Sequence, residues 1–229
     1  MAKVVGFALM AAMLVTIGVI KVAAGNHAGI GDIDGIYVQE RPGGMQGFRW
    51  DVHLFFKNGQ AYRRIDVPIE DLDVNESKRT DPDRWVTWRR EGGSVFFTAP
   101  DGGEKRIKIR WKMIPGGEDE DLSGRRYSAS SSHVDTVSGT AVAWGQDIYF
   151  LDGHRYTTGK FSGFTSAQVV AYQEQNPEAS GTYRISGYTI EFVPKEGTAH
   201  RELFFFGDAH GSKDEDVVGV AGKFYLLKK

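Results

Sequence analysis

The chain of 229 residues contains no cysteine. Disulfides, thiolate nucleophiles, thiolate metal sites and the lipidated cysteine of bacterial lipoproteins all need a sulfur atom, so these features are excluded. Any metal site must use histidine and carboxylate ligands. The fold must be stabilised by packing alone.

The chain also lacks an excess of positive charge, because 28 Lys and Arg residues stand against 30 Asp and Glu residues. Proteins that bind nucleic acids usually carry a clear basic excess, so we expect no nucleic-acid partner. Hydrophobic residues make up 41% of the chain and charged residues 25%. This composition is typical of one or two globular domains.

The common catalytic motifs are missing too. There is no Gly-x-Ser-x-Gly elbow, no glycine-rich phosphate loop before a helix and no His-Glu-x-x-His pair. The six histidines are scattered: His27, His53, His133, His154, His200 and His210. We therefore assign no catalytic residue and no cofactor. An enzyme whose site is assembled from distant segments stays an alternative.

The amino terminus has the order of a secretory signal. Lys3 precedes the uncharged run Val4–Ile20, and the small residues Val22, Ala23 and Ala24 follow Lys21. Cleavage after Ala24 is predicted, which makes residues 1–24 a signal peptide. The alternative is an uncleaved anchor over residues 4–20, a length at the short end of the roughly 17 to 25 residues that span a bilayer. Both predict an exported protein, periplasmic or extracellular, that touches a membrane only through this segment.

Beyond residue 30, apolar and polar residues alternate between glycine-containing turns, which is typical of antiparallel strands. In residues 107–113 every odd position is apolar and every even one cationic. Asn58-Gly59, Asp101-Gly102, Asp152-Gly153 and Glu196-Gly197 each separate two strand-like runs. The sequence predicts an all-β, mainly antiparallel fold.

The chain matches itself at a nearly constant offset, which indicates a tandem repeat. Residues 54–62 align with 148–156, 94–97 with 189–192, 119–122 with 214–217, and 124–127 with 222–225. We expect two related barrel-like or curled-sheet domains, residues 30–128 and 129–229. One short helix is predicted in the second copy, over residues 166–175. The matching acidic stretch 68–83 is predicted as a loop or a single helical turn.

The second copy also carries a recognisable pattern. A strand ending in Asp152-Gly153 is followed by Gly-x-Tyr-x-Ile-x-Gly-x-Thr-Ile-x-Phe over residues 181–192. This order resembles the small bacterial lipocalin-like domains of exported proteins. The resemblance covers most of the second copy and less of the first. It implies a barrel and an apolar ligand cavity, and it transfers no catalytic residue.

Aromatic residues are the candidates for lining such a cavity. Trp50, Phe56, Trp88 and Trp111 are assigned as ligand-binding candidates. The alternative is that they fill the core, since Trp50 and Phe56 share one strand face with Val52 and Leu54.

Two strand-like segments have unusual surfaces. Arg106, Lys108, Arg110 and Lys112 form a cationic stripe, either a face for an anionic partner or an outer face paired with acids across the sheet. Residues 203–206 are apolar without alternation. They predict a strand buried on both faces, between the two copies, or else an exposed patch for a partner.

Two acidic segments were considered as metal sites. Residues 71–75 place oxygen ligands as in a calcium loop, but Glu76 stands where that loop needs Gly, and Pro82 where it needs Glu. A second segment holds Asp208, His210 and the acidic run 214–216. We assign no metal to either, and a cation at the second stays an alternative.

These features together predict an exported, non-enzymatic binding protein of the cell envelope. Its partner is expected to be a small apolar ligand or an envelope protein. The first alternative is a structural or interaction module whose barrels are filled with side chains, and the second is an enzyme.

Overall fold

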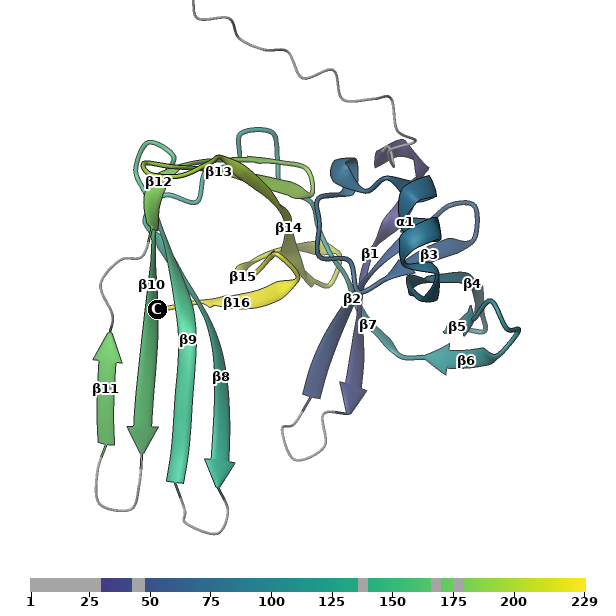
Figure 1. Ribbon diagram of the computed structural model, residues 1–229, viewed down its shortest axis with the longest axis horizontal. Helices are drawn as coiled ribbons and strands as arrows, with labels where there is room; N and C mark the ends of the chain where they lie inside the picture. The colour runs from purple at the N-terminus through teal and green to yellow at the C-terminus, as the bar shows by residue number, and fades with distance from the viewer. Residues whose placement is uncertain (1–29, 43–47, 136–139, 166–169, 175–178) are drawn as a thin grey trace, which may run out of the picture.

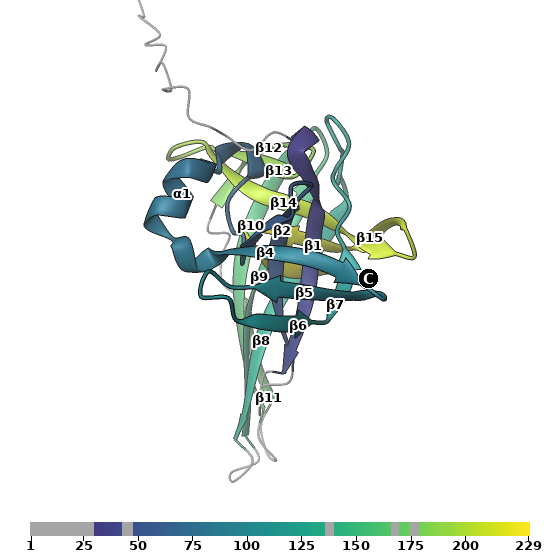
Figure 2. The ribbon, with the colours of Figure 1, turned by 90° about the vertical axis from the view of Figure 1, so that its right-hand side faces the viewer.

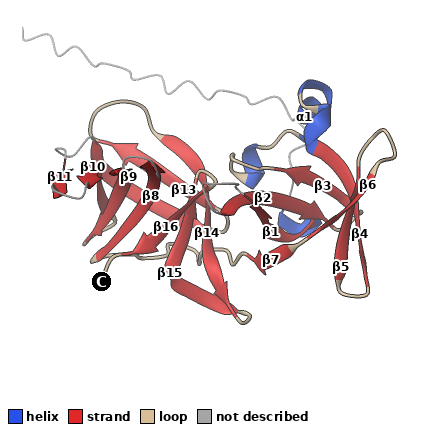
Figure 3. Ribbon diagram, turned by 90° about the horizontal axis from the view of Figure 1, so that it is seen from below, coloured by secondary structure: helices blue, strands red, loops and turns tan. Residues whose placement is uncertain are grey.

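The computed structural model describes residues 30–42, 48–135, 140–165, 170–174 and 179–229. The predicted signal or anchor segment lies outside these residues. Strands dominate, and they form two antiparallel sheets that lie side by side (Figure 1, Figure 3). The all-β, antiparallel fold class is therefore confirmed.

The first sheet has seven strands in the order β6-β5-β4-β3-β2-β1-β7 and is curled. Its strands are β1 (Ile33–Pro42), β2 (Phe48–Phe56), β3 (Gln60–Arg63), β4 (Trp85–Glu91), β5 (Ser94–Thr98), β6 (Glu104–Ile107) and β7 (Ile109–Lys112). The 3-10 turn η1 (Ile30–Asp32) precedes β1. Asn58-Gly59 forms the turn between β2 and β3, with Gly59 at a φ of 81°, a conformation that glycine adopts without strain.

The second sheet closes into a barrel. Its strands are β8 (Arg125–Asp135), β9 (Thr140–Leu151), β10 (Arg155–Thr165), β11 (Val170–Glu174), β12 (Ala179–Ser186), β13 (Thr189–Pro194), β14 (His200–Ala209), β15 (Ser212–Val220) and β16 (Lys223–Leu227). The order is β11-β10-β12-β13-β14-β15-β16-β8-β9, and β10 also pairs with β9. Eight strands thus close on themselves, with β11 outside the ring on β10. Ring closure leaves no exposed edge where a strand pairs with both of its neighbours.

The prediction of a helix over residues 166–175 is wrong for residues 170–174, the part of this segment that the structure describes. Residues 170–174 form β11, which pairs with β10 from Thr165 opposite Val170 to Phe161 opposite Glu174. Strand pairing with β10 overrides the local preference of this segment for helix. Residues 166–169 and 175 lie outside the described residues.

The helix α1 (Val74–Thr80) lies instead in the first half, between the 3-10 turns η3 (Ile69–Asp71) and η4 (Pro82–Arg84). The N–H of Glu76 donates to Asp73 Oδ1 over 2.9 Å, which caps the helix, and Pro82 follows its end. The predicted loop or single turn therefore extends to a seven-residue helix. Within the described ranges, no helix has both the length and the apolar character needed to cross a bilayer.

Aromatic side chains fill the interior of the barrel. The buried cluster there consists of Leu122, Tyr127, Ile148, Phe150, Tyr156, Tyr183, Ile185, Ile190, Phe192, Phe204, Phe206, Val218, Val220 and Tyr225. Rings of Phe150 and Tyr183 meet edge to face at 4.7 Å. Such contacts are favourable beyond the area they bury.

Strand β14 lies on the side of the barrel that faces the first sheet (Figure 1), and its side chains belong to two hydrophobic cores. Phe204 and Phe206 point to the barrel core, whereas Leu203 and Phe205 join the core of the first sheet, and all four side chains are 0% exposed. The predicted burial on both faces between the two domains is confirmed.

Polar contacts and short bridges also join the two sheets. Residue 114 pairs with Phe206 and Gly116 with Gly187, both antiparallel, along the connecting segment 113–124. The Tyr188 hydroxyl donates to the Met113 carbonyl over 3.1 Å. Arg201 donates to Asp71 over 2.6 Å. The two sheets thus share a core and a polar border.

Candidate functional site

An open groove of about 320 Å³ lies where the two sheets meet. This volume is at the lower end of the range for small-molecule sites, roughly 300 to 1,000 Å³. The groove is lined by Trp50, Asp51 and Val52 of β2, by Arg64, Ile65, Asp66 and Arg84 beyond β3, and by Ala221 and Gly222 of the β15–β16 turn.

Trp50 provides the exposed aromatic wall of the groove. Its side chain is 36% exposed. The ring packs on Trp111 of β7 at 4.9 Å and on Phe224 of β16 at 6.4 Å. The indole is thus supported by both sheets.

A buried histidine holds the backbone at Arg64. His53 is 1% exposed, and its Nδ1 accepts a hydrogen bond from the Arg64 N–H over 3.2 Å. Its Nε2 therefore carries the proton and donates to Gln39 Oε1 over 3.0 Å. Burial lowers the pKa of His53 to about 4, so the ring is neutral at physiological pH. The bond holds Arg64 at a φ of 56°, which non-glycine residues rarely adopt.

The other charges of the groove are paired. Arg84 donates to Asp66 over 3.1 Å and to the Tyr62 hydroxyl over 3.0 Å, and the bond to Asp66 raises the pKa of Arg84 further above its usual range. Asp51 accepts from Arg41 over 2.8 Å. Among the described residues, Arg64 has no acidic partner. The groove therefore offers one available guanidinium beside an exposed indole.

The four aromatic candidates from the sequence do not share one cavity. Trp50 and Trp111 contact each other beside the groove. Phe56 is 5% exposed and stacks on Trp85. Trp88 lies on the opposite face of the sheet, where it packs on Phe55 at 4.7 Å. Only Trp50 lines the groove, and Phe56 fills the core as the alternative expected.

The cationic stripe is not one strand. Arg106 is in β6, whereas Arg110 and Lys112 are in β7, and these two strands stand at opposite ends of the sheet order. The chain turns between them at Lys108 so that β7 can pair with β1, for example Lys112 opposite Tyr37. Lys108 pairs with Glu40 at 3.4 Å. The prediction of one strand over residues 107–113 is therefore wrong, and the Lys108–Glu40 pair is of the kind that the alternative expected, whereas a face for an anionic partner stays a prediction.

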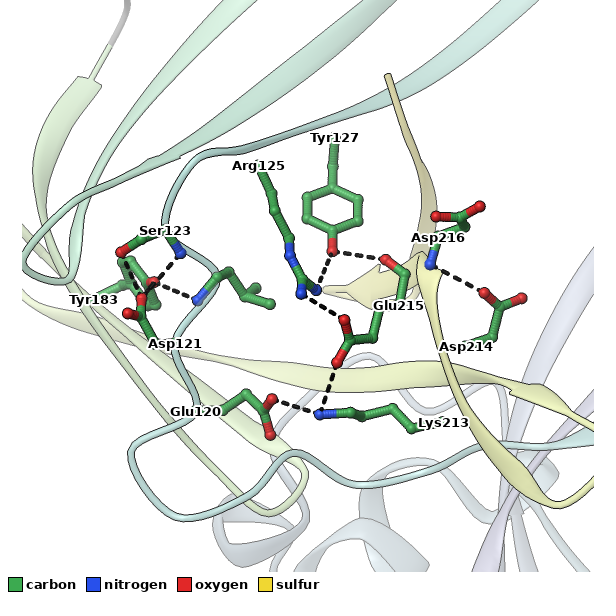
Figure 4. A network of polar contacts seen from close by, with 11 residues as sticks. Glu120, Asp121, Ser123, Arg125, Tyr127, Tyr183, Lys213, Asp214, Glu215 and Asp216 are labelled. Atoms are coloured by element: carbon green, nitrogen blue, oxygen red, sulfur yellow. Dashed lines mark hydrogen bonds and ion pairs between the residues drawn. The ribbon is translucent and has the colours of Figure 1, made fainter. Parts of the chain in front are cut away.

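The acidic segment near residue 214 forms a network with the connecting segment (Figure 4). Lys213 Nζ lies 2.5 Å from Glu120 Oε1 and 3.2 Å from Glu215 Oε1. Arg125 donates to Glu215 over 2.5 Å, and these two cations lower the pKa of Glu215. Asp208 Oδ1 accepts the Gly211 N–H, again at 2.5 Å. Each carboxylate named here accepts a hydrogen bond from, or forms an ion pair with, another group of the chain.

The calcium-like string of residues 71–75 also has structural roles. Asp73 caps α1, and Asp71 pairs with Arg201 of β14. Within the part of the chain that the structure describes, no three His, Asp or Glu side chains group so as to hold a metal ion.

The groove residues other than Trp50 were missed by sequence reasoning. They come from three distant segments, and the left-handed backbone at Arg64 has no signature in a single sequence. The adjacent Arg63-Arg64 pair before an apolar residue was the one local hint.

The fold defines a protein in which an eight-stranded, up-and-down antiparallel barrel packs on a curled antiparallel sheet. Comparison of the chain with family models, with curated proteins and with solved structures gives no match.

Proposed function

We propose that the chain is an exported, non-enzymatic binding protein of the cell envelope whose ligand occupies the groove between the two sheets. The observation that carries this proposal is that Trp50, whose side chain is 36% exposed, and Arg64, which has no acidic partner among the described residues, line the same groove. Export is proposed from the amino-terminal pattern of residues 3–24.

The chemistry of the groove favours a polar ligand with a ring and a negative charge. Four of its lining side chains are charged, and the apolar Val52 and Ile65 are 3% and 1% exposed, so an apolar ligand would meet mainly the indole. An indole face stacks on sugar and aromatic rings. A guanidinium binds a carboxylate or phosphate by two parallel hydrogen bonds. An acidic saccharide combines both features.

We place the ligand in the groove and not in the barrel interior. The interior positions that the lipocalin-like resemblance would assign to an apolar ligand hold side chains such as Tyr127 at 0% and Phe150 at 1% exposed. This packing favours the second candidate function, a structural or interaction module with a filled barrel.

The tandem repeat is also proposed. In the curled sheet β1 to β6 are consecutive neighbours, and in the barrel β8, β9, β10, β12, β13 and β14 follow the same order. The β2–β3 turn matches the β9–β10 turn, and β5 matches β13, at the offsets seen in the sequence. These equivalences support two related copies of a lipocalin-like unit.

Fluorescence titration tests the groove. We expect D-glucuronate to change the tryptophan emission of the purified protein and D-glucose to do so only weakly. Trp50→Ala and Arg64→Gln should abolish the response. Trp144→Ala and Arg90→Gln, which replace exposed residues outside the groove, should bind as the unchanged protein does.

Native mass spectrometry of the protein purified from its own host extends the test to the natural ligand. A co-purified small molecule that is lost in both Trp50→Ala and Arg64→Gln supports the proposal. If the protein purifies without a small molecule and does not bind D-glucuronate, the result argues for the structural or interaction module.

A further inference from the structure

The barrel carries a protruding arm. It is made of the ends of β8, β9 and β10 together with the short strand β11. β8, β9 and β10 have 11, 12 and 11 residues, whereas β12, β13 and β16 have 8, 6 and 5. The long strands and β11 therefore continue past the rest of the barrel, as both side views show (Figure 1, Figure 2). Their order across the arm is β8-β9-β10-β11.

One border of this arm is an unpaired strand edge. β16 pairs with β8 only at Tyr127 and Ser128, next to the hydrogen bond from the Lys228 N–H to the Arg126 carbonyl. Residues 129–135 pair with β9 on one side. On their other side no described strand pairs with them. Alternate N–H and C=O groups along this edge are thus available for another strand.

This edge lacks the features that normally prevent pairing with a second chain. Natural edge strands are kept apart by lysines, prolines, bulges or short length. Residues 129–134 are Ala-Ser-Ser-Ser-His-Val, with a single acid at Asp135. Their register with β9 runs without a shift from Arg125 to Asp135.

The β6 edge of the curled sheet shows the contrast. β6 has four residues, of which Glu104, Lys105 and Arg106 are exposed. Glu104 also forms an ion pair with Arg89 at 3.0 Å. The same chain therefore protects the β6 edge with charge and leaves the β8 edge without it.

The next strand of the arm, β9, carries two exposed apolar side chains. Val142 and Trp144 of β9 are 37% and 49% exposed, and their backbone partners on β8 are His133 and Ser131. A strand added at β8 would lie two strands from these side chains. The new pair would therefore be held by its backbone hydrogen bonds.

We propose that β8 pairs with β8 of a second copy of this chain, forming a two-fold symmetric dimer with one continuous sheet across both arms. A two-fold contact uses the same edge on both partners and is complete with two copies, whereas a head-to-tail β8–β11 contact would build a ring or an open chain of copies. Antiparallel pairing centred on residues 129–135 places Ser132 of one copy directly opposite Ser132 of the other. The proposal rests on the strand edges and is independent of the groove.

The absence of cysteine makes this pairing directly testable. Directly opposed residues of antiparallel strands have Cα atoms about 4.5 to 5.5 Å apart, which fits a disulfide. We expect Ser132→Cys to form a covalent dimer under mild oxidation. Arg106→Cys, the same kind of probe on the charged β6 edge, should stay monomeric. Equal cross-linking of the two variants would contradict the proposal.

Sedimentation velocity gives a second readout on the unsubstituted chain. We expect a concentration-dependent monomer–dimer equilibrium. Ser132→Lys places like charges opposite each other and should weaken the dimer by about tenfold or more. A monomer at every concentration, or multimers that grow beyond two copies, overturns the proposed two-fold pairing.

Discussion

The buried imidazole of His53 predicts that the stability of this protein depends on pH in a defined window. His53 is 1% exposed, accepts the Arg64 N–H and donates to Gln39, so its site is built for the neutral ring. Protonation would convert the accepting Nδ1 into a donor that faces another donor. The loss of hydration on burial is the main reason that the pKa falls from 6.5 to about 4.

The sign of the effect follows from proton binding. Between a pH of 6.5 and about 4, the unfolded chain binds a proton at His53 and the folded chain does not, so acid favours the unfolded state. Stability from this residue is fully present above the unfolded pKa and is lost as the pH falls to the folded value. A difference of about 2.5 pKa units corresponds to roughly 3 kcal/mol across this window.

Urea unfolding measured at a series of pH values from about 7 to 4 tests this prediction. The free energy of unfolding of His53→Gln should lose roughly 3 kcal/mol less over this range than that of the unsubstituted protein. His210→Gln, the same replacement at an exposed histidine, is the matched control. Equal pH slopes in all three proteins would refute the reasoning, as would an NMR titration in which the His53 ring protonates near its ordinary pKa.

Three further substitutions probe how the sheets are held. Phe205→Ala removes a ring that is 0% exposed in the shared core and should cost about 3 to 5 kcal/mol in urea unfolding; a loss below about 1 kcal/mol would contradict the shared core. Asp147→Asn removes the charge that Arg126 and Lys228 contact and should cost about 2 kcal/mol, measured in the same way. Arg201→Ala breaks an exposed ion pair between the sheets and should cost less than about 1 kcal/mol, which thermal unfolding can check.

The strands were predictable because their patterns are local. Alternation of apolar and polar residues marks a half-buried strand, and the contiguous run of residues 203–206 marks one covered on both faces. The helix prediction at residues 170–174 was wrong for the opposite reason, because a non-local contact decides the structure there. Helix propensity is a weak local preference, and the backbone of β10 supplies a complete set of hydrogen-bonding partners for a strand.

The candidate site was only partly predictable because it depends on how the two sheets pack. Trp50 was chosen for its ring, but nothing near residue 50 indicates that residues 221 and 222 lie beside it. The cationic stripe failed for a related reason, since its alternation is real and only the change of partner strand at Lys108 separates Arg106 from Arg110. A single sequence gives the periodicity of a segment and leaves its partners undetermined.

The different ends of the two proposed copies explain why a groove exists between them. After β14 the barrel adds β15 and β16, and β16 closes the ring against β8. The matching residues 119–122 of the first half lie instead in the connecting segment, and β7 pairs directly with β1.

A closed barrel covers its inner face by itself, whereas an open sheet needs another layer over any apolar face. The face of the curled sheet with Val52 and Leu54 is covered by Leu203 and Phe205 of the barrel. Val52 and Ala221 line the groove at the border of this contact. The site thus follows from the packing of a closed barrel on an open sheet: had the first sheet closed like the second, β14 would have no apolar face to cover.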